Sequence, residues 1–188
     1  DRRALVFVIG LCGLNVFSAP LISLGVPLRI TDAQWPSATL GTSEAIFSAL
    51  ALTGSLLAGW IRLHHQVTAA YTLLLIQAVA YAGIALTHRT TLYLSMAIIG
   101  FTAGLASVWL SATFVQLVDA AHLGRVAAIS NLGDLLLVPL ATPAFGALTN
   151  HIGIATSPLL LAGGMLTLCA AIIARPDIRA ITVPSRGA

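Results

Sequence analysis

The segment 130–143, SNLGDLLLVPLATP, places a carboxylate, Asp134, inside a run of residues that otherwise suit the interior of a lipid bilayer. An ionisable side chain at membrane depth costs about 2.5–3.5 kcal/mol on insertion scales, so it tends to face a bundle interior or a wet cavity. Asp134 lies eight residues after Val126, which is about 12 Å of helix. Ser130 and Asn131 precede Asp134 by four and three residues and share its helix face. The three residues predict a proton-coupling or cavity-lining site.

Other polar and aromatic side chains also fall deep inside apolar runs. Asn15 lies in the middle of the first run, and Trp109 and Ser111 lie in the fourth. We add these three residues to the candidate cavity, although a hydrogen bond to a neighbouring helix is an equally simple role for Asn15. Glu44 lies one turn into the second run, from where a carboxylate can reach the bilayer surface. It is therefore either an outer-side functional group or an interfacial one.

The sequence argues against catalysis inside the membrane. None of the five histidines falls within an apolar run, so an intramembrane nucleophile would lack a base and a metal would lack its commonest ligand. A phosphate-binding loop of the type G-x-x-x-x-G-K is also absent. Cys12 and Cys169 have no C-x-x-C spacing and are expected to be small core residues. We therefore expect no enzyme, no catalytic residue, no metal and no cofactor.

The candidate residues must be positioned by membrane-spanning helices. Of all residues, 58% are hydrophobic and 8% are charged, with a mean hydropathy of +0.97, whereas a soluble domain has about 25% charged residues. A bilayer core takes about 20 apolar residues as helix. The composition predicts an all-α integral membrane protein with one domain at residues 1–175 and a polar, disordered cytoplasmic tail at 176–188. Its six apolar runs predict spans at 4–28, 40–61, 67–86, 92–118, 126–148 and 154–174.

The arginines predict how the six spans are oriented. All nine basic residues are arginine, and they are scattered at span ends rather than clustered, which argues against nucleic acid as a partner. Seven of them fall on the side of the two termini, and two, Arg29 and Arg89, fall on the other. The positive-inside rule therefore predicts that both termini are cytoplasmic. Four aromatic residues fall at expected span ends, where aromatic rings settle at the headgroup level, namely Trp35, Trp60, Tyr71 and Tyr93.

Small residues recur at helical spacing in two of the runs. The fourth run carries Gly100, Gly104, Ser107 and Ser111, and the sixth carries Gly163, Thr167, Ala170 and Ala174. Such faces let a neighbouring helix backbone approach closely. They predict a compact helix bundle and say little about a ligand.

Several segments together resemble a known family of membrane proteins. They are GSLLAGWIR at the end of the second run, LVDAAHLGRVAAISNLG between the fourth and fifth, and PAFGALTNHIG between the fifth and sixth. With six spans and both ends inside, they resemble the C-terminal half of a major facilitator superfamily (MFS) transporter, most of all its drug and siderophore exporters. Residues 122–126, HLGRV, keep the G-R-V core of the family's cytoplasmic connection and lack its first arginine. AGWIR keeps Ala58, Gly59 and Arg62 of the inter-span motif and lacks its acidic residue.

The resemblance implies an MFS-type half-transporter made of two inverted three-helix repeats, corresponding to helices seven to twelve of twelve. The first and fourth spans would line a central cavity, and the second and fifth would meet a missing N-terminal half or a second copy. The third and sixth spans would face lipid. Arg62 and Arg125 would form a cytoplasmic gate. Asp134 would load and release a proton as water reaches it in one conformation and is excluded in the other.

From this resemblance we expect a multi-pass protein of the plasma membrane, which in a bacterium is the inner membrane. We expect it to export a small lipophilic or amphipathic molecule in exchange for protons. Its expected partners are the bilayer, the substrate, protons and the second half. The alternative is a truncated, non-transporting remnant or scaffold that packs through its small-residue faces. The polar residues Ser130, Asn131 and Asp134 favour transport, because a scaffold has no need of them.

Overall fold

The computed structural model describes residues 2–61, 63–119 and 121–179, and this part of the chain is helical apart from short turns. Its first span joins α1 (Arg2–Pro20), a π-helical turn (Leu21–Gly25) and α2 (Val26–Asp32). The other helices are α3 (Ala38–Trp60), α4 (Gln66–Ile84), α5 (Arg89–Leu117), α6 (Leu123–Ile152), α7 (Ser157–Ala174) and α8 (Pro176–Arg179). Six helical segments are long and apolar enough to cross a membrane. The prediction of an all-α chain with six candidate spans is therefore confirmed.

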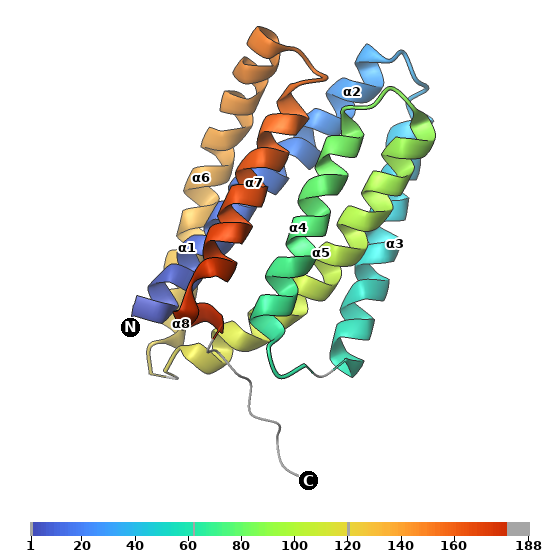
Figure 1. Ribbon diagram of the computed structural model, residues 1–188. Coiled ribbons are helices and arrows are strands. Elements are labelled where there is room, and N and C mark those ends of the chain that lie inside the picture. The colour runs from blue at the N-terminus through green and yellow to red at the C-terminus, as the bar shows by residue number, and fades with distance from the viewer. Residues whose placement is uncertain (1, 62, 120, 180–188) are drawn as a thin grey trace.

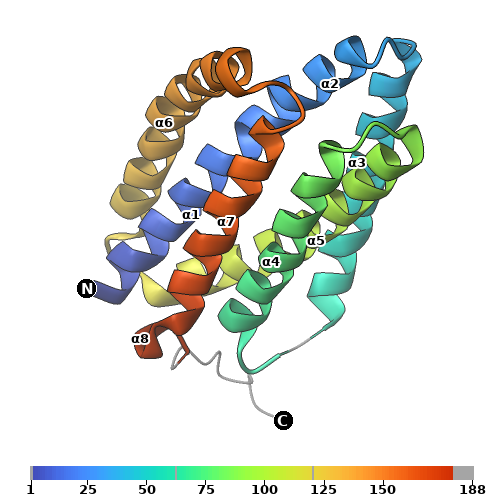
Figure 2. The same cartoon turned by 45° about the horizontal axis from the view of Figure 1, so that its top comes forward.

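The start of α1 and the short helix α8 lie at the same end of the bundle (Figures 1 and 2). We call this the terminal end, and the turns that follow α2, α4 and α6 lie at the opposite end. Residues 176–179, expected to begin a disordered tail, instead form α8. Ile178 is buried there, and the Arg179 Nε donates to the carbonyl of Ile173 at 2.6 Å. Residues 180–188 lie outside the described residues.

The long helices pack as two groups of three. α5 packs against both α3 and α4, and α1 packs against both α6 and α7. Figure 2 shows the two groups side by side, and they are joined mainly where α4 packs against α7. α1 and α5 meet at only a few positions. Space for a groove is therefore left between α1 and α5, with α4 and α7 behind it.

Prolines explain why the first span changes helix type half way along. Proline has no N–H donor, so Pro20 and Pro27 each leave a carbonyl of the preceding turn without its helical partner. The five-residue π-helical turn lies between these prolines, and such turns accompany bends. The Ser18 hydroxyl donates to the carbonyl of Leu14 at 2.7 Å, which also favours bending. The helix then continues as α2 to Asp32, beyond the expected end of the span at residue 28.

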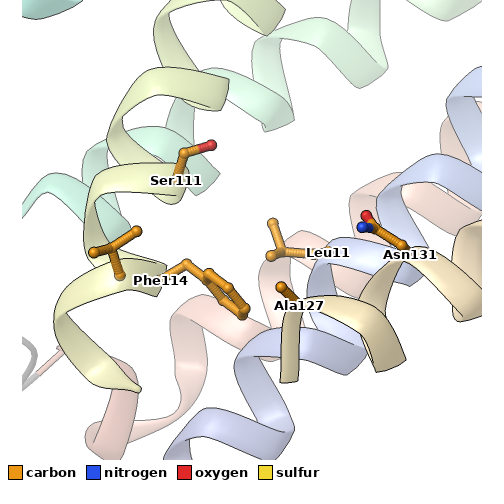
Figure 3. Close-up of a pocket in the computed structure, with 6 residues that line it drawn as sticks. Leu11, Ser111, Phe114, Ala127 and Asn131 are labelled. Atoms are coloured by element: carbon orange, nitrogen blue, oxygen red, sulfur yellow. The ribbon is translucent and has the colours of Figure 1, made fainter. Parts of the chain in front are cut away.

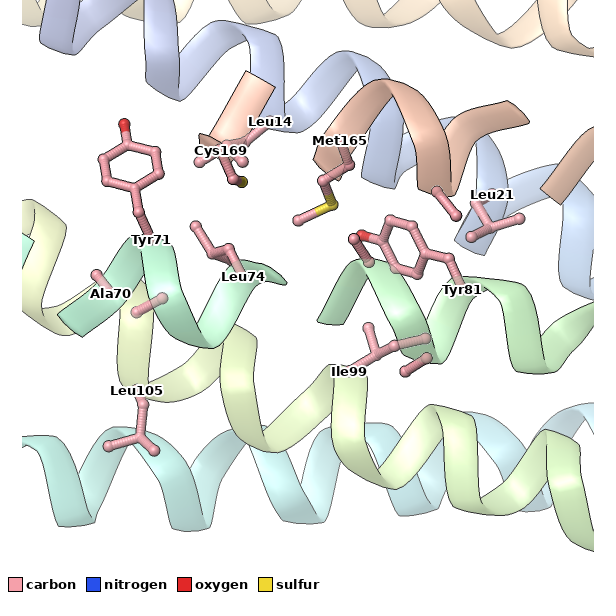
Figure 4. Close-up of a cluster of buried hydrophobic side chains, with 14 of the residues drawn as sticks. Leu14, Leu21, Ala70, Tyr71, Leu74, Tyr81, Ile99, Leu105, Met165 and Cys169 are labelled. Carbon is pink, nitrogen blue, oxygen red and sulfur yellow. The ribbon is translucent and has the colours of Figure 1, made fainter. Parts of the chain in front are cut away.

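α4 supplies the centre of the core. Its residues Tyr71, Leu74 and Tyr81 point toward Met165 and Cys169 of α7 (Figure 4). Both cysteines of the chain are buried, as expected. The third span was expected to face lipid, yet half of its most apolar stretch is buried, as much as in α5. Tyr71, expected to anchor at the membrane surface, is instead fully buried inside the bundle, with its hydroxyl next to Gly10 of α1.

A buried hydrogen-bond chain links α4 to α5. The Gln77 side-chain amide donates to the Tyr81 hydroxyl at 2.7 Å, and the Thr102 hydroxyl donates to Gln77 Oε1 at 3.2 Å. Hydrogen bonds between helices help to hold a membrane bundle together. Gln77 therefore has a structural role between two helices.

Glycines let α3 and α5 touch backbone to backbone. A Cβ atom added at Gly100 would collide with the carbonyl of Phe47, and one added at Gly104 would collide with that of Ala51. On α3, Gly54 lies equally close to the backbone of α5. These contacts confirm that Gly100 and Gly104 of the fourth span pack a neighbouring helix. Ser107 and Ser111, expected on the same packing face, are instead exposed. The corresponding residues of the sixth span are instead exposed, namely Gly163, Thr167, Ala170 and Ala174.

α3 and α6 are the least buried of the six spans. Only 11% of the most apolar stretch of α3 and 12% of that of α6 is buried, against 50% in α4 and α5. Both helices turn large apolar side chains outward, among them Leu52, Leu56, Leu135 and Leu140. Each of the two helices therefore has an outer face that no other part of the described chain covers.

Candidate functional site

Two adjoining hollows lie between α1 and α5. The first has a volume of about 250 Å³ and is bounded by α1, α4, α5 and α7. The second has a volume of about 230 Å³ and lies between α1, α5 and α6. The hollows share Leu11 and Ser111 as lining residues. We call the two hollows together the groove.

The first hollow combines apolar walls with neutral polar groups. Asn15 and Ser18 come from α1, Ser107 and Ser111 from α5, and Gln77 from α4. The rest of the lining is apolar, with leucines from three helices and Met165 from α7. Small-molecule sites have this composition, in which apolar side chains predominate and a few polar groups fix the orientation of the ligand.

The second hollow lies nearer the terminal end, where α6 begins. Figure 3 shows Leu11, Phe114 and Ala127 around one space, with Ser111 above them and Asn131 on the neighbouring α6. Ser111 and Asn131 are exposed. This hollow is therefore open, and its polar side chains are accessible.

An aromatic pair connects the two walls of the groove. The rings of Phe7 on α1 and Phe114 on α5 stack with their centroids 6.5 Å apart and their planes at 24°. Phe7 lies near the start of α1 and Phe114 near the end of α5, so the pair lies toward the terminal end. The walls of the groove are therefore in direct contact at that end.

Three side chains of the groove have uncommitted hydrogen-bonding groups. Within the described ranges, the side chains of Asn15, Ser111 and Asn131 form no hydrogen bond to the protein. By contrast, the hydroxyls of Ser18 and Ser107 donate to carbonyls of their own helices at 2.7 and 2.9 Å. Polar groups at membrane depth need a partner. No described protein group supplies one for these three side chains.

The structure brings together three of the candidate cavity residues and separates a fourth. Asn15, Ser111 and Asn131 line the groove. Trp109 does not, because its indole Nε1 donates to the carbonyl of Ala58 on α3 at 3.2 Å and its side chain is 5% exposed. Two residues along a helix correspond to a rotation of about 200°. Trp109 and Ser111 therefore face opposite sides of α5.

Of the remaining candidates, Ser130 and Asp134 belong to α6. Each lies three residues after an α6 residue that lines the second hollow, Ala127 or Asn131. The side chains of Ser130 and Asp134 lie outside the described part of the structure, as does Arg62 entirely. Glu44 is exposed on α3, and Arg125 is exposed in the first turn of α6. Neither of these two charged residues lines the groove.

Arg29 is a buried residue whose structural part the sequence did not reveal. It is 4% exposed, and its guanidinium donates to the Ala85 carbonyl at 2.6 Å and to the Thr87 hydroxyl at 3.2 Å. It also pairs with Asp32 at 3.1 Å. These bonds tie α2 to the turn between α4 and α5. Only the i, i+3 spacing to Asp32 was visible in the sequence.

Next to this cluster, the guanidinium of Arg89 lies 5.9 Å from the centroid of the Trp35 ring. This is the range of a cation–π contact. The two arginines on this side of the bundle therefore both hold turns in place.

Among the side chains that the structure describes, no three of His, Cys, Asp or Glu could together hold a metal ion. In comparisons with known proteins, no family model matches the sequence. No curated protein matches it either. The fold and the six apolar helices define the chain as a candidate multi-pass, all-α membrane protein.

Proposed function

We propose that this chain is the C-terminal half of an MFS-type transporter that exports a small lipophilic or amphipathic molecule in exchange for protons. The observation that carries the proposal is the groove between the first and fourth spans, whose mainly apolar lining includes the polar side chains of Asn15, Ser111 and Asn131. These are the spans to which the resemblance assigns the substrate pathway. A polar groove inside a membrane bundle is typical of a substrate path.

The packing of the helices supports two related repeats. The second span packs against the fourth, and the fifth packs against the first. Likewise, the third packs against the fourth and the sixth against the first, while the third and sixth pack against each other. These five main contacts map onto one another when spans one to three are exchanged with spans four to six, whereas the small contact between α6 and α7 has no counterpart of similar size between α3 and α4. Inverted three-helix repeats have this property.

The outward faces of α3 and α6 support a missing partner. These two helices are the second and fifth spans, which the resemblance assigns to the contact with an N-terminal half. On α3, the exposed face carries Gly41, Ala45 and Ser48 at spacings of four and three residues. Small residues at this spacing are typical of helix–helix contacts in membranes.

Within the proposal, Asp134 exchanges the proton and both termini are cytoplasmic. Asp134 lies in α6 three residues after Asn131, which lines the groove. Exposed Arg125 begins the same helix at the terminal end, where the proposal places the cytoplasmic gate with Arg62. The excess of arginine at this end supports a cytoplasmic position.

The proposal is tested in proteoliposomes that contain the chain at a density at which a second copy can take the place of the N-terminal half. The vesicles are loaded with a pH-sensitive dye and supplied with a panel of lipophilic compounds. We expect proton movement that depends on the added compound. The variant Asp134→Asn should abolish it, because an amide side chain does not take up and release a proton as a carboxylate does. Glu44→Gln is the matched control, since Glu44 lies outside the groove and its loss should leave proton movement intact. Unchanged movement in Asp134→Asn would remove this residue from the mechanism.

A non-transporting scaffold is the second candidate function. The observation that favours it is the exposed row of small residues on α7, which no described helix covers. A scaffold would bind another membrane helix along this row. The two candidates therefore differ in which face of the chain meets a partner.

A further inference from the structure

We propose that the groove selects an uncharged lipophilic molecule that carries a hydroxyl, carbonyl or amide group, and that Asn15 is the main residue that recognises this group. This inference rests on the proposed function, in that it takes the groove as the transport site. The inference is that the ligand is neutral. The proposed function alone would also allow a cationic ligand, because a carboxylate such as Asp134 can pair with a cation.

The first step of the argument is the charge of the lining. None of the described side chains that line either hollow is ionisable. A charged ligand in a cleft of low dielectric constant loses its hydration and needs a nearby opposite charge to replace it. The described groove has no such charge. A neutral ligand has no equivalent cost.

The second step is the hydrogen-bonding capacity that the groove leaves open. Asn15 and Asn131 each offer donors and an acceptor that no protein group uses, and Ser111 offers a hydroxyl between them. A side-chain amide can bond a hydroxyl, a carbonyl or another amide. Asn15 is half-buried whereas Asn131 is exposed. A bond to Asn15 is therefore better shielded from water and contributes more to selection.

The third step is the fit of an apolar body. Leu14 and Leu110 line the first hollow together with Met165, and Phe114 lines the second. Methionine adapts to ligands of different shape. The hollows of about 250 and 230 Å³ adjoin at Leu11 and Ser111. Their combined size falls in the range of pockets for drug-sized molecules, about 300–1,000 Å³.

The test compares three fluorescent probes on the purified chain in lipid nanodiscs, with empty nanodiscs subtracted. The probes are Nile red, which is neutral and has a carbonyl, rhodamine 6G, which is a cation, and anilinonaphthalene sulfonate, which is an anion. We expect Nile red to bind at least tenfold more tightly than either charged probe. Asn15→Leu should weaken Nile red binding about tenfold, the effect of a lost buried hydrogen bond.

Asn150→Leu is the matched control, because Asn150 is an exposed asparagine of α6 that does not line the groove. It should leave Nile red binding unchanged. A second variant, Asn15→Asp, distinguishes a lost contact with the ligand from a failure of the chain to fold. Its new carboxylate should weaken the binding of Nile red and strengthen that of rhodamine 6G, and a misfolded chain would not gain affinity for a cation.

Two results would overturn the proposal. One is tighter binding of rhodamine 6G than of Nile red, lost in Asp134→Asn, which would identify a cation paired with Asp134. The other is an equal effect of Asn15→Leu and Asn150→Leu on Nile red. Neither measurement needs a proton gradient. Selective binding of Nile red without proton-coupled flux would contradict the proposed transport but support the proposed class of ligand. Proton-coupled flux of cations alone would contradict only the proposed class of ligand.

Discussion

Arg29 illustrates how one side chain can hold two distant segments together. Its two hydrogen bonds to the turn after α4 span more than fifty residues of sequence. Hydrogen bonds that involve a charged group contribute about 1.5–3 kcal/mol each when both partners are present. The partner Asp32 is 48% exposed, and an exposed ion pair contributes about 0–1 kcal/mol. The bonds to the turn are therefore more important than the ion pair.

We predict that Arg29→Met lowers the free energy of unfolding by about 2–3 kcal/mol, because the Ala85 carbonyl loses a charged donor. Thermal unfolding of the purified chain in detergent, followed by differential scanning fluorimetry, measures the effect. Asp32→Asn is the control and should cost less than about 1 kcal/mol. Equal losses in the two variants would show that the ion pair, and not the bond to the turn, stabilises this end.

At the scale of single residues, the sequence predicted part of the groove. Asn15, Ser111 and Asn131 stood out because polar groups are rare at membrane depth. Trp109 could not be separated from Ser111 by depth alone, since the direction of a side chain depends on which neighbour its helix faces. Arg29 could not be assigned a structural role, because a backbone carbonyl as partner leaves no mark in the sequence.

Among the helices, α3 and α5 form the contact with the strictest steric requirement. We predict that Gly104→Ala lowers the free energy of unfolding by about 1–3 kcal/mol, the usual cost of overpacking. The added methyl group would meet the Ala51 carbonyl of α3, which as backbone cannot move aside. Unfolding in a denaturing detergent, followed by circular dichroism, measures the change.

The same substitution at Gly163 provides the control for Gly104→Ala. A Cβ atom at Gly163 on α7 meets nothing within 4 Å, and alanine favours helix over glycine by about 1 kcal/mol. Gly163→Ala should therefore be neutral or slightly stabilising. A destabilised Gly163→Ala together with an unaffected Gly104→Ala would contradict the packing described here.

Hydropathy predicted the six spans because each long apolar run must become a helix in a bilayer. The helix ends differ from the predicted span ends because a helix does not stop where polar residues begin. α5, for example, begins at Arg89 rather than at residue 92. The π-helical turn and α8 had no such signal. The π-helical turn depends on which backbone carbonyls remain unpaired. α8 depends on the packing of Ile178 against the bundle.

For the molecule as a whole, the outer face that meets a partner distinguishes the two candidate functions. We predict that the purified chain associates through α3, and that Ala45→Leu on the exposed face of α3 reduces its mass to that of a monomer. A leucine there would separate two closely packed helices. Light scattering in detergent measures the mass.

Ala170→Leu, on the exposed row of α7, is the matched control and should leave the mass unchanged. If instead Ala170→Leu dissociates the chain and Ala45→Leu does not, the scaffold is the better account of the protein. A wild-type chain that is already a monomer would contradict association through either face.

The grouping of the helices also has a consequence for synthesis in the cell. α3, α4 and α5 are consecutive in the chain and pack on one another, so they can assemble while the ribosome is still working. α1 packs against α6 and α7, which are made after α5. At the usual speed of translation this interval is on the order of ten seconds. During it, the asparagine and serine residues of the first span have no helix of their own group beside them, so their polar groups are exposed to lipid or to water until α6 and α7 are in place.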